Sequence, residues 1–251
     1  MLEILYMDNH FVAVNKPAGL MVHRARSAPQ ETDFALQMVR DMVGCRVYPV
    51  HRLDKHTSGV LIFGLHPGAA GRLGRSFSGR SVTKTYLAVV RGHTPAAGAI
   101  DKPLVKYREK KIRTRIEQPA LTRYFRLGTI EIPYPVGRYA TGRYSLLKIR
   151  PETGRYQQIR RHLQHVSHPV IGDRAHGDTR HNRLFETVFV CRRMLLAAAR
   201  IDFKHPYTDQ NIAIQARLDR PFSAVIQNFG WHCLPGPEML CPAAPVQLPA
   251  A

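Results

Sequence analysis

Acidic residues, paired cysteines and long apolar runs are scarce in this chain of 251 residues. Its four cysteines form no Cys-x-x-Cys pair, and a chain of this size does not depend on disulfides, so we interpret them as reduced thiols. No apolar run approaches the roughly 20 residues of a membrane-spanning helix. The first six residues lack the basic and apolar regions of a signal peptide. We therefore expect a cytoplasmic protein with no membrane association.

The charge balance of the sequence is strongly positive. Lys and Arg number 37 against 18 Asp and Glu, so the formal net charge is +19. Solubility alone needs a net charge of only about 2 to 8, and a larger excess repels itself in the compact state. Phosphate neutralisation and counterion release convert such an excess into affinity for nucleic acid. Nucleic acid is therefore the partner that the composition favours.

Strand-like segments outnumber helical ones along the chain. Apolar alternation and β-branched content predict two strands within 2–16 about an Asp8-Asn9 turn, and further strands at 47–50, 60–65, 83–91, 121–132, 143–150, 194–203 and 212–215. Apolar spacing predicts helices at 32–43, capped by Thr32 or Asp33, and at 67–77, 156–165 and 221–229. Because the strands rarely alternate with helices, we expect an α+β fold around a mainly antiparallel sheet. The Pro- and Ala-rich tail at 232–251 is expected to be disordered, which leaves 1–231 as one domain.

The densest run of cations lies at 106–115, where Glu109 is the one acid. In an extended segment, residues two apart share a face. We interpret the run as an exposed hairpin or loop that follows a phosphate backbone, with four candidate contacts at Lys110, Lys111, Arg113 and Arg115. The ordinary alternative is a solvated, partly disordered insertion.

One carboxylate lies among cations in the segment from His51 to Phe63. Asp54 has Arg52, Lys55 and two histidines as neighbours, and a Thr-Ser-Gly turn then leads into an apolar strand. Loops on a rigid scaffold are where catalytic groups tend to lie. Surrounding cations favour a charged carboxylate, which can act as a nucleophile or base. The ordinary alternative is a turn carboxylate that pairs with Lys55 or Arg52.

Further motifs follow this loop in a definite order. They are Lys84-Thr85-Tyr86 on a predicted strand and Thr153-Gly154-Arg155-Tyr156-Gln157-Gln158-Ile159-Arg160, with an Asn15-Lys16-Pro17-Ala18-Gly19 turn before them and the Leu195 region after them. Together they resemble the RluA-type pseudouridine synthases, over about residues 1–231. Within that family the chain most resembles the branch that acts on uridine 65 of tRNA, by its start directly on the catalytic core, by Gly172–Asp178 and by Phe229–Trp231. The resemblance implies a sheet of two juxtaposed halves with flanking helices.

The resemblance also implies a role for each matching residue. Asp54 is the essential carboxylate, and Arg160 is the basic residue that pairs with it. Tyr86 stacks on the target base and is a candidate to take its C5 proton. Arg52 helps to extrude the base, and Leu195 lines the base pocket. Taken alone, Tyr86 fits a core position and Arg160 a solvated helix face, so the motif set carries both assignments.

The implied reaction isomerises uridine to pseudouridine in RNA, most closely in tRNA. It breaks the C1′–N1 bond, turns the base and joins C5 to C1′, with no metal, redox or nucleotide cofactor. Whether Asp54 attacks the base, attacks C1′ or abstracts a sugar proton stays open. We expect a monomer that needs no protein partner, with Lys84 as a further substrate contact. The alternatives are an rRNA pseudouridine synthase of the same family and a non-catalytic RNA-binding or folding factor.

Two departures and two rival interpretations complete the prediction. Gln157 and Leu196 stand where the family often has His, which changes the hydrogen bonding expected near the pocket. The His-Arg-Leu-Asp order resembles a kinase catalytic loop, but no Gly-rich phosphate loop or Asp-Phe-Gly accompanies it. A metal site is not favoured by the three histidines spaced three apart, because they fan across about 120° of a helix without a carboxylate or cysteine; they are His162, His165 and His168.

Overall fold

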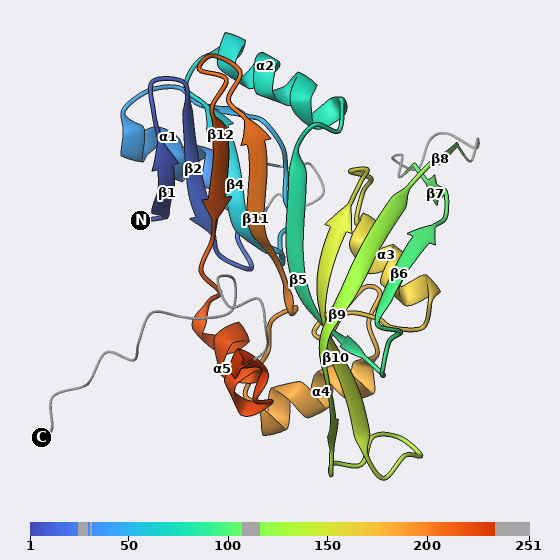
Figure 1. Ribbon diagram of the computed structural model, residues 1–251. Coiled ribbons are helices and arrows are strands. Elements are labelled where there is room, and N and C mark those ends of the chain that lie inside the picture. The colour runs from blue at the N-terminus through green and yellow to red at the C-terminus, as the bar shows by residue number, and fades with distance from the viewer. Residues whose placement is uncertain (25–29, 31, 107–115, 234–251) are drawn as a thin grey trace, which may run out of the picture.

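The computed structural model describes residues 1–24, 30, 32–106 and 116–233 (Figure 1). The strands are β1 Glu3–Met7, β2 Phe11–Lys16, β3 Tyr48–Pro49, β4 Ser58–Gly64, β5 Thr83–Arg91, β6 Ala97–Asp101, β7 Leu104–Val105, β8 Glu117–Gln118, β9 Leu121–Ile132, β10 Gly142–Pro151, β11 Leu196–Lys204 and β12 Asn211–Gln215. The helices are α1 Ala35–Val43, α2 Pro67–Ser78, α3 Gln158–His165, α4 Thr179–Val188 and α5 Arg220–Asn228, followed by a 3-10 turn at Trp231–Cys233.

Two halves of one large sheet meet where β5 pairs with β11. The strand order is β1-β2-β4-β11-β5-β10-β9-β6, with β12 beside β11 and β3 beside β4. The pairs are antiparallel except β4 with β11, which run parallel. In Figure 1, β1, β2, β4, β11 and β12 form the left half, and β5, β10, β9 and β6 form the right half. The expected α+β fold with a mainly antiparallel mixed sheet is confirmed.

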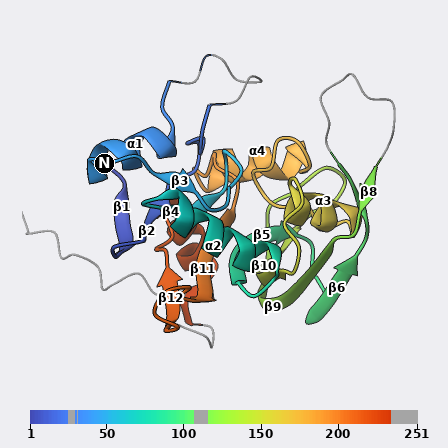
Figure 2. The ribbon, with the colours of Figure 1, turned by 90° about the horizontal axis from the view of Figure 1, so that it is seen from above.

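Helices cover both faces of this sheet. Alternate residues of β4 point to opposite sides: Leu61 and Phe63 pack with α1, whereas Val60 and Ile62 pack with α2. In the other half, the β5 face that carries Ala88 packs with α3, and the reverse face packs with α5. Figure 2 shows α1 and α3 on one side of the sheet and α2 on the other. The α1–α3 face is the one that matters for the chemistry, because the Asp54 loop lies on it.

The structure corrects the expected start of two helices. The N-cap of α1 is Phe34, without a side-chain capping bond, so the expected cap at Thr32 or Asp33 is wrong. The main chain holds that end instead, because the N–H groups of Ala35 and Leu36 donate to carbonyls 2.8 and 3.0 Å away in an earlier loop. Helix α3 begins two residues later than predicted, because Gln157 has a left-handed φ of 52°.

Candidate active site

The Asp54 loop joins β3 to β4 and enters the sheet where β4 pairs with β11, one strand away from the junction of the two halves. Gly59, at the start of β4, pairs in parallel with Ala198 of β11 and has a φ of 111°. A side chain at Gly59 would collide with the carbonyl oxygen of Ala198, so glycine allows these two strands to approach. The Thr-Ser-Gly sequence therefore places the loop against the β4–β11 seam.

A buried lysine fastens the same loop from the other side. Lys16 is fully buried, and its Nζ donates to the carbonyl oxygens of Pro17, Leu20 and Lys55 at 2.9, 2.8 and 3.1 Å. The N–H of Gly19 also donates to the Lys55 carbonyl, at 2.8 Å. Burial lowers the pKa of Lys16 to about 7. The Asn-Lys-Pro-Ala-Gly turn is thus a clamp on the residue that follows Asp54.

Arg160 joins Asp54 to a second carboxylate that lies deeper in the protein. Its Nη1 donates to Asp54 Oδ2 at 2.9 Å, while Nε and Nη2 donate to the two oxygens of Asp173 at 2.6 and 2.8 Å. The Arg160 and Asp173 side chains are 6% and 0% exposed, whereas the Asp54 side chain is 20% exposed. The two-pronged pair with Asp173 fixes the guanidinium plane. Arg160 can then hold Asp54 in one rotamer at the surface.

The surroundings of this network favour its charged form. Burial opposes charge on Asp173, but the Arg160 guanidinium and the N–H groups of His176 and Ala175 hold the pKa of Asp173 below its usual value. Burial likewise opposes charge on Arg160, yet the hydrogen bonds that it donates to Asp173 and Asp54 raise its pKa. The network therefore carries one cation and two carboxylates, and solvent reaches the Asp54 end.

Tyr86 lies on the same face, at the junction of the two halves. It pairs with Ala198 of β11 on one side and with Ile149 of β10 on the other. Its ring packs against both apolar clusters of the α1–α3 face. Burial raises the pKa of the phenol, and the charge of Asp54 raises it further. Asp54, Arg160 and Tyr86, predicted from three separate motifs, are thus brought together.

The expected substrate contacts Arg52 and Lys84 lie on either side of the loop. Arg52 is exposed. The pKa of His23 is lowered mainly by its own burial and further by the charge of Arg52. Lys84 is two residues before Tyr86 on β5, where it pairs with Ile201 of the apolar cluster on the α2 side. Burial and then the charge of Lys84 lower the pKa of His51 to about 3. His51 itself points away, since its ring stacks on Phe77 at 4.7 Å.

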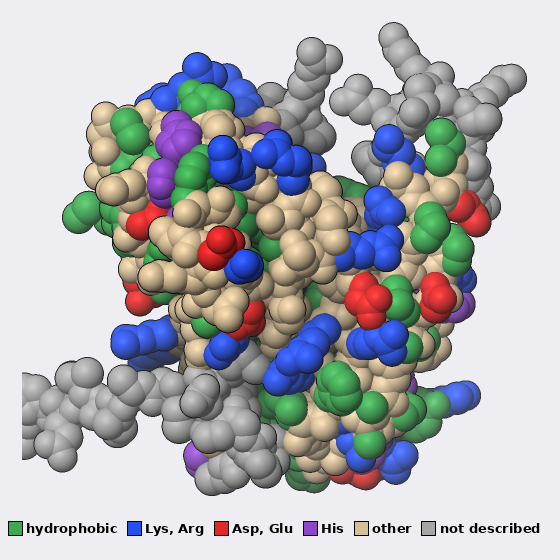
Figure 3. Space-filling model, turned by 45° about the horizontal axis from the view of Figure 1, so that its top comes forward, with side chains coloured by type: hydrophobic (Ala, Val, Ile, Leu, Met, Phe, Trp, Pro, Cys, Tyr) green, Lys and Arg blue, Asp and Glu red, His purple; other side chains and the backbone are tan. Residues whose placement is uncertain are grey.

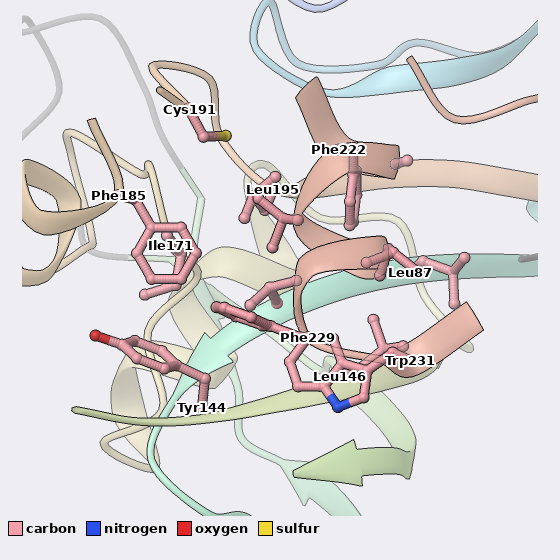
Figure 4. Close-up of a cluster of buried hydrophobic side chains, with 14 of the residues drawn as sticks. Leu87, Tyr144, Leu146, Ile171, Phe185, Cys191, Leu195, Phe222, Phe229 and Trp231 are labelled. Atoms are coloured by element: carbon pink, nitrogen blue, oxygen red, sulfur yellow. The ribbon is translucent and has the colours of Figure 1, made fainter. Parts of the chain in front are cut away.

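Leu195 is not brought together with these residues. It is fully buried in the cluster behind the sheet, among Leu87, Phe222 and Phe229, as Figure 4 shows. That cluster is on the opposite face from Tyr86. The adjoining residues Met194 and Leu196 are the ones that pack on the α3 side. The side-chain alternation of an extended segment explains the shift by one position.

The predicted cation contacts Lys110, Lys111, Arg113 and Arg115 lie outside the described residues. Their flanks form a two-stranded hairpin, β7 with β8, closed by Lys106 N–H donating to the Ile116 carbonyl at 2.8 Å. Arg161 of α3 donates to the Val105 carbonyl at 3.2 Å and ties this hairpin to the helix that carries Arg160. On the face drawn in Figure 3, Lys and Arg side chains are spread over both halves of the molecule.

Two residues near the site, Asp173 and His176, were not predicted as functional from the sequence. Asp173 and His176 follow α3 and occur in the Gly172–Asp178 segment, which by itself indicated only a branch of the family. His176 Nε2 lies 2.8 Å from Oε1 of Gln157, the residue where the family often has His. The departure at Gln157 is therefore accommodated by a hydrogen bond within the site. Asp173 is recognised only in the structure, as the buried carboxylate that accepts two hydrogen bonds from Arg160.

His162, one of the three histidines considered and not favoured as metal ligands, is used in packing. His162 is fully buried, with Nδ1 2.9 Å from Thr122 Oγ1 and Nε2 3.0 Å from the Lys102 carbonyl oxygen. Both ring nitrogens are thus used in packing α3 onto the sheet. Among the described residues, no group of three metal-ligating side chains gathers, and no helix is long and apolar enough to cross a bilayer.

Comparisons with known proteins place this geometry in a family. The family model described as RNA pseudouridylate synthase matches residues 10–165. The tRNA pseudouridine synthase C of Pectobacterium carotovorum subsp. carotovorum is 46% identical over 236 residues, which are 92% of this chain and 63% of that protein. The protein of the same name from Vibrio vulnificus is 43% identical over 92% of this chain and 96% of its own.

A solved structure agrees with the sequence matches. The human RNA pseudouridylate synthase domain containing 1 superposes with a TM-score of 0.67 at 26% identity, over 87% of this chain and 84% of that one. The family model covers more than half of the chain, and the Vibrio vulnificus relative is matched over nearly its whole length. The protein therefore belongs to the RNA pseudouridylate synthase family and is an RNA pseudouridine synthase.

Proposed function

We propose that the protein isomerises one uridine of a tRNA to pseudouridine, with Asp54 as its essential carboxylate. The observation that carries this proposal is the Asp54–Arg160–Asp173 network, which holds one partly exposed carboxylate beside the half-buried ring of Tyr86. An ordinary surface ion pair has no need of a second, fully buried carboxylate behind its arginine. Here Asp173 fixes Arg160, and Arg160 fixes Asp54.

The reaction needs a carboxylate in this position and no external reagent. The C1′–N1 glycosidic bond breaks, the uracil turns within the site, and C5 joins C1′. The proton on C5 then leaves, and N1 takes up a proton, so that substrate and product are isomers. Asp54 can serve by attack on the base, by attack on C1′ or by abstraction of a sugar proton, and each route begins from the ionised group.

Tyr86 is proposed as the platform for the flipped base. Its flat, largely buried ring suits stacking on a uracil that has left its helix. Because its pKa is raised, the phenol keeps its proton at neutral pH. It can accept the C5 proton only after passing its own proton to another group. Met194 and Leu196, rather than Leu195, are proposed as the apolar lining on this face.

Arg52 and Lys84 are proposed as substrate contacts that act beside this platform. The exposed Arg52 is positioned to enter the RNA stack and fill the gap that the flipped base leaves. Lys84, two residues before Tyr86 on β5, is proposed to supply positive charge for the RNA backbone. The cations of 106–115 are proposed to follow the RNA backbone further out.

The choice of tRNA rests on the names of the relatives. The proteins that this chain matches over most of its length are named tRNA pseudouridine synthase C. The proposed target is uridine 65, with an rRNA uridine as the alternative. We further propose that residues 1–231 form the catalytic domain of a monomer that acts in the cytoplasm without a protein partner.

Asp54→Asn tests the proposal directly. The amide keeps the shape of the carboxylate but cannot act as a nucleophile or base, so pseudouridine formation on tRNA transcripts should fall by several orders of magnitude. RNA binding should be nearly unchanged. Pseudouridine mapping of cellular RNA with and without the wild-type protein identifies the position. Product formation by the variant would overturn the role of Asp54, and an rRNA site alone would select the alternative substrate.

A further inference from the structure

A polar cavity of about 410 Å³ lies beside the Asp54 site. It is bounded by the end of β5, the turn after α3 and the start of α4. Polar side chains predominate in its lining, which consists of Arg91, Gln164, Ser167, His176, Asp178, Thr179 and Arg180 together with Pro169 and Gly177. Cavities of about 300 to 1,000 Å³ hold ligands the size of a nucleotide. The lining suits a sugar and phosphate, because it offers hydroxyl and amide groups and two arginines beside one carboxylate.

Three arginines surround the outer rim of this cavity. Arg138 donates to the hydroxyl of Tyr139, a side chain that is 59% exposed. That hydrogen bond lowers the pKa of Tyr139, and the charges of Arg91 and Arg180 lower it further, so all three cations lie around one phenol. A Cβ on Gly137 would lie 2.8 Å from Arg180 Nη1, which brings the β9–β10 hairpin against α4. Figure 1 shows that hairpin beside α4.

The carboxylate at this rim does not cancel the positive charge. Asp178 accepts from Arg91 Nη1 at 2.7 Å and from the Arg180 N–H at 3.0 Å, and it caps α4. The negative charge of Asp178 is thus balanced by the positive charge of Arg91. Arg180 has its Nε 3.8 Å from Asp178 and a side chain that is 72% exposed. Its guanidinium is therefore available to an anion in the cavity.

His176 connects the cavity to the chemistry. Its ring lines the cavity, and its Nε2 is held by Gln157 at 2.8 Å. Its backbone N–H donates to Asp173 at 3.0 Å, the carboxylate that orients Arg160. The charge of Asp54 also acts on this ring. His176 therefore lines the cavity and also bonds to the Asp173 end of the Asp54 network.

We propose that this cavity binds the ribose and phosphate of a nucleotide next to the target uridine, with Arg180 as the main phosphate contact. The inference rests on the proposed function and adds to it the place where the RNA strand continues beside the flipped base. A base flipped out of its helix keeps its backbone on both sides, so a site for a neighbouring phosphate helps to hold the extruded geometry.

Arg180→Gln and Arg192→Gln form a matched pair for the test. Both arginines are exposed on or just after α4, and both substitutions remove one charge; Arg192 pairs with Glu186 and does not line the cavity. For Arg180→Gln the Kd for tRNA should rise, and the salt dependence of log Kd should weaken by about 0.7 to 0.9. For Arg192→Gln both binding quantities should stay at the wild-type values, and equal changes in the two variants would overturn the proposal.

Neutral phosphates locate the contact on the RNA. In a series of tRNA stem substrates, each phosphate near the target uridine is replaced in turn by an uncharged methylphosphonate. At one position the wild type should lose affinity while Arg180→Gln loses none, which is the signature of a direct contact. If wild type forms pseudouridine but no position couples to Arg180, the cavity proposal fails alone. If wild type modifies no tRNA, the proposed function fails.

Discussion

Two buried arginines, Arg160 and Arg193, lie near the seam of the sheet and do different work. Their side chains are 6% and 10% exposed, and each pairs with an aspartate. Arg193 donates to Asp219, to Ser58 Oγ at 3.1 Å and to two carbonyls of the β11 segment, and its guanidinium lies over the Phe222 ring. These hydrogen bonds of Arg193 all go to other groups of the protein. They connect α5, β4 and the β11 segment.

Arg160 differs in having one more carboxylate than its own charge requires. Asp173 takes two of its donors in the interior, and Asp54 takes the third at the surface. The Arg193 pair is electrically neutral, whereas the Arg160 triad carries one surplus negative charge. That surplus lies at the end which solvent and substrate reach. The two arginines are similarly buried, so what distinguishes Arg160 is its second carboxylate, and the proposed role of Arg160 in the chemistry rests on that partner.

Arg160→Met should have the largest effect of the predicted substitutions. It leaves Asp54 without its orienting donor and Asp173 as a buried charge without its cation. We expect the single-turnover rate of pseudouridine formation to fall by roughly 10²-fold or more, as when a preorganised charged donor is removed. The free energy of unfolding in urea should also fall, by about 3 to 5 kcal/mol.

Arg161→Met is the control on the same helix. Arg161 donates to the Val105 and Tyr156 carbonyls at 3.2 and 3.4 Å, whereas the hydrogen bonds of the triad come from Arg160. Its loss should leave the rate at saturating RNA close to wild type. A rate for Arg160→Met that matches the control would mean that Asp54 does not depend on Arg160.

Arg193→Met should lower stability and spare the chemistry. Removal of a buried cation from Asp219 and from its carbonyl acceptors should reduce the free energy of unfolding by about 3 kcal/mol. The rate per folded molecule should stay unchanged, measured below the unfolding transition. Adding Asp219→Asn should recover part of the lost stability, because it removes the stranded charge. A large loss of rate in the folded variant would break the contrast between the two arginines.

Much of the fold follows from local sequence patterns. The strand predicted at 83–91 coincides with β5, and the one at 121–132 coincides with β9. The elements that were not predicted include β6 at Ala97–Asp101 and helix α4, besides the two-residue strands β7 and β8. Small residues dominate β6, and α4 has few apolar side chains, so neither carries a clear periodicity. Both are held by their neighbours in space, β6 by β9 and α4 by the cluster around Phe185.

The site was predictable only where a motif named its residue. Asp54, Tyr86 and Arg160 came from three motifs that converge in space. Asp173 was not assigned a role because nothing local marks a carboxylate as the partner of an arginine 13 positions earlier. Leu195 was placed one residue out, because the face that a residue takes at a strand edge depends on the register of pairing.

His51 gives the smallest predicted effect and separates the scaffold side of the loop from its reactive side. Its Nε2 accepts from the Ile62 N–H at 3.2 Å, and burial lowers its pKa to about 3. In the unfolded chain the pKa is about 6.5. Above that value both states hold a neutral ring. Below it the unfolded chain binds a proton that the folded protein does not, so stability falls as the pH falls from about 6.5 toward 3.

His51→Gln isolates this contribution, because the amide oxygen can accept from Ile62 but does not titrate. Between pH 7.5 and 5.5 the wild type should lose about 1.4 kcal/mol more of its free energy of unfolding than the variant, measured in urea at both pH values. At pH 7.5 the single-turnover rates should agree, since the ring faces Phe77 and not the triad. If the free energy of unfolding falls equally with pH in wild type and variant, His51 takes up a proton in the folded protein as readily as in the unfolded chain. That result would contradict its assignment to the neutral, scaffold side of the loop.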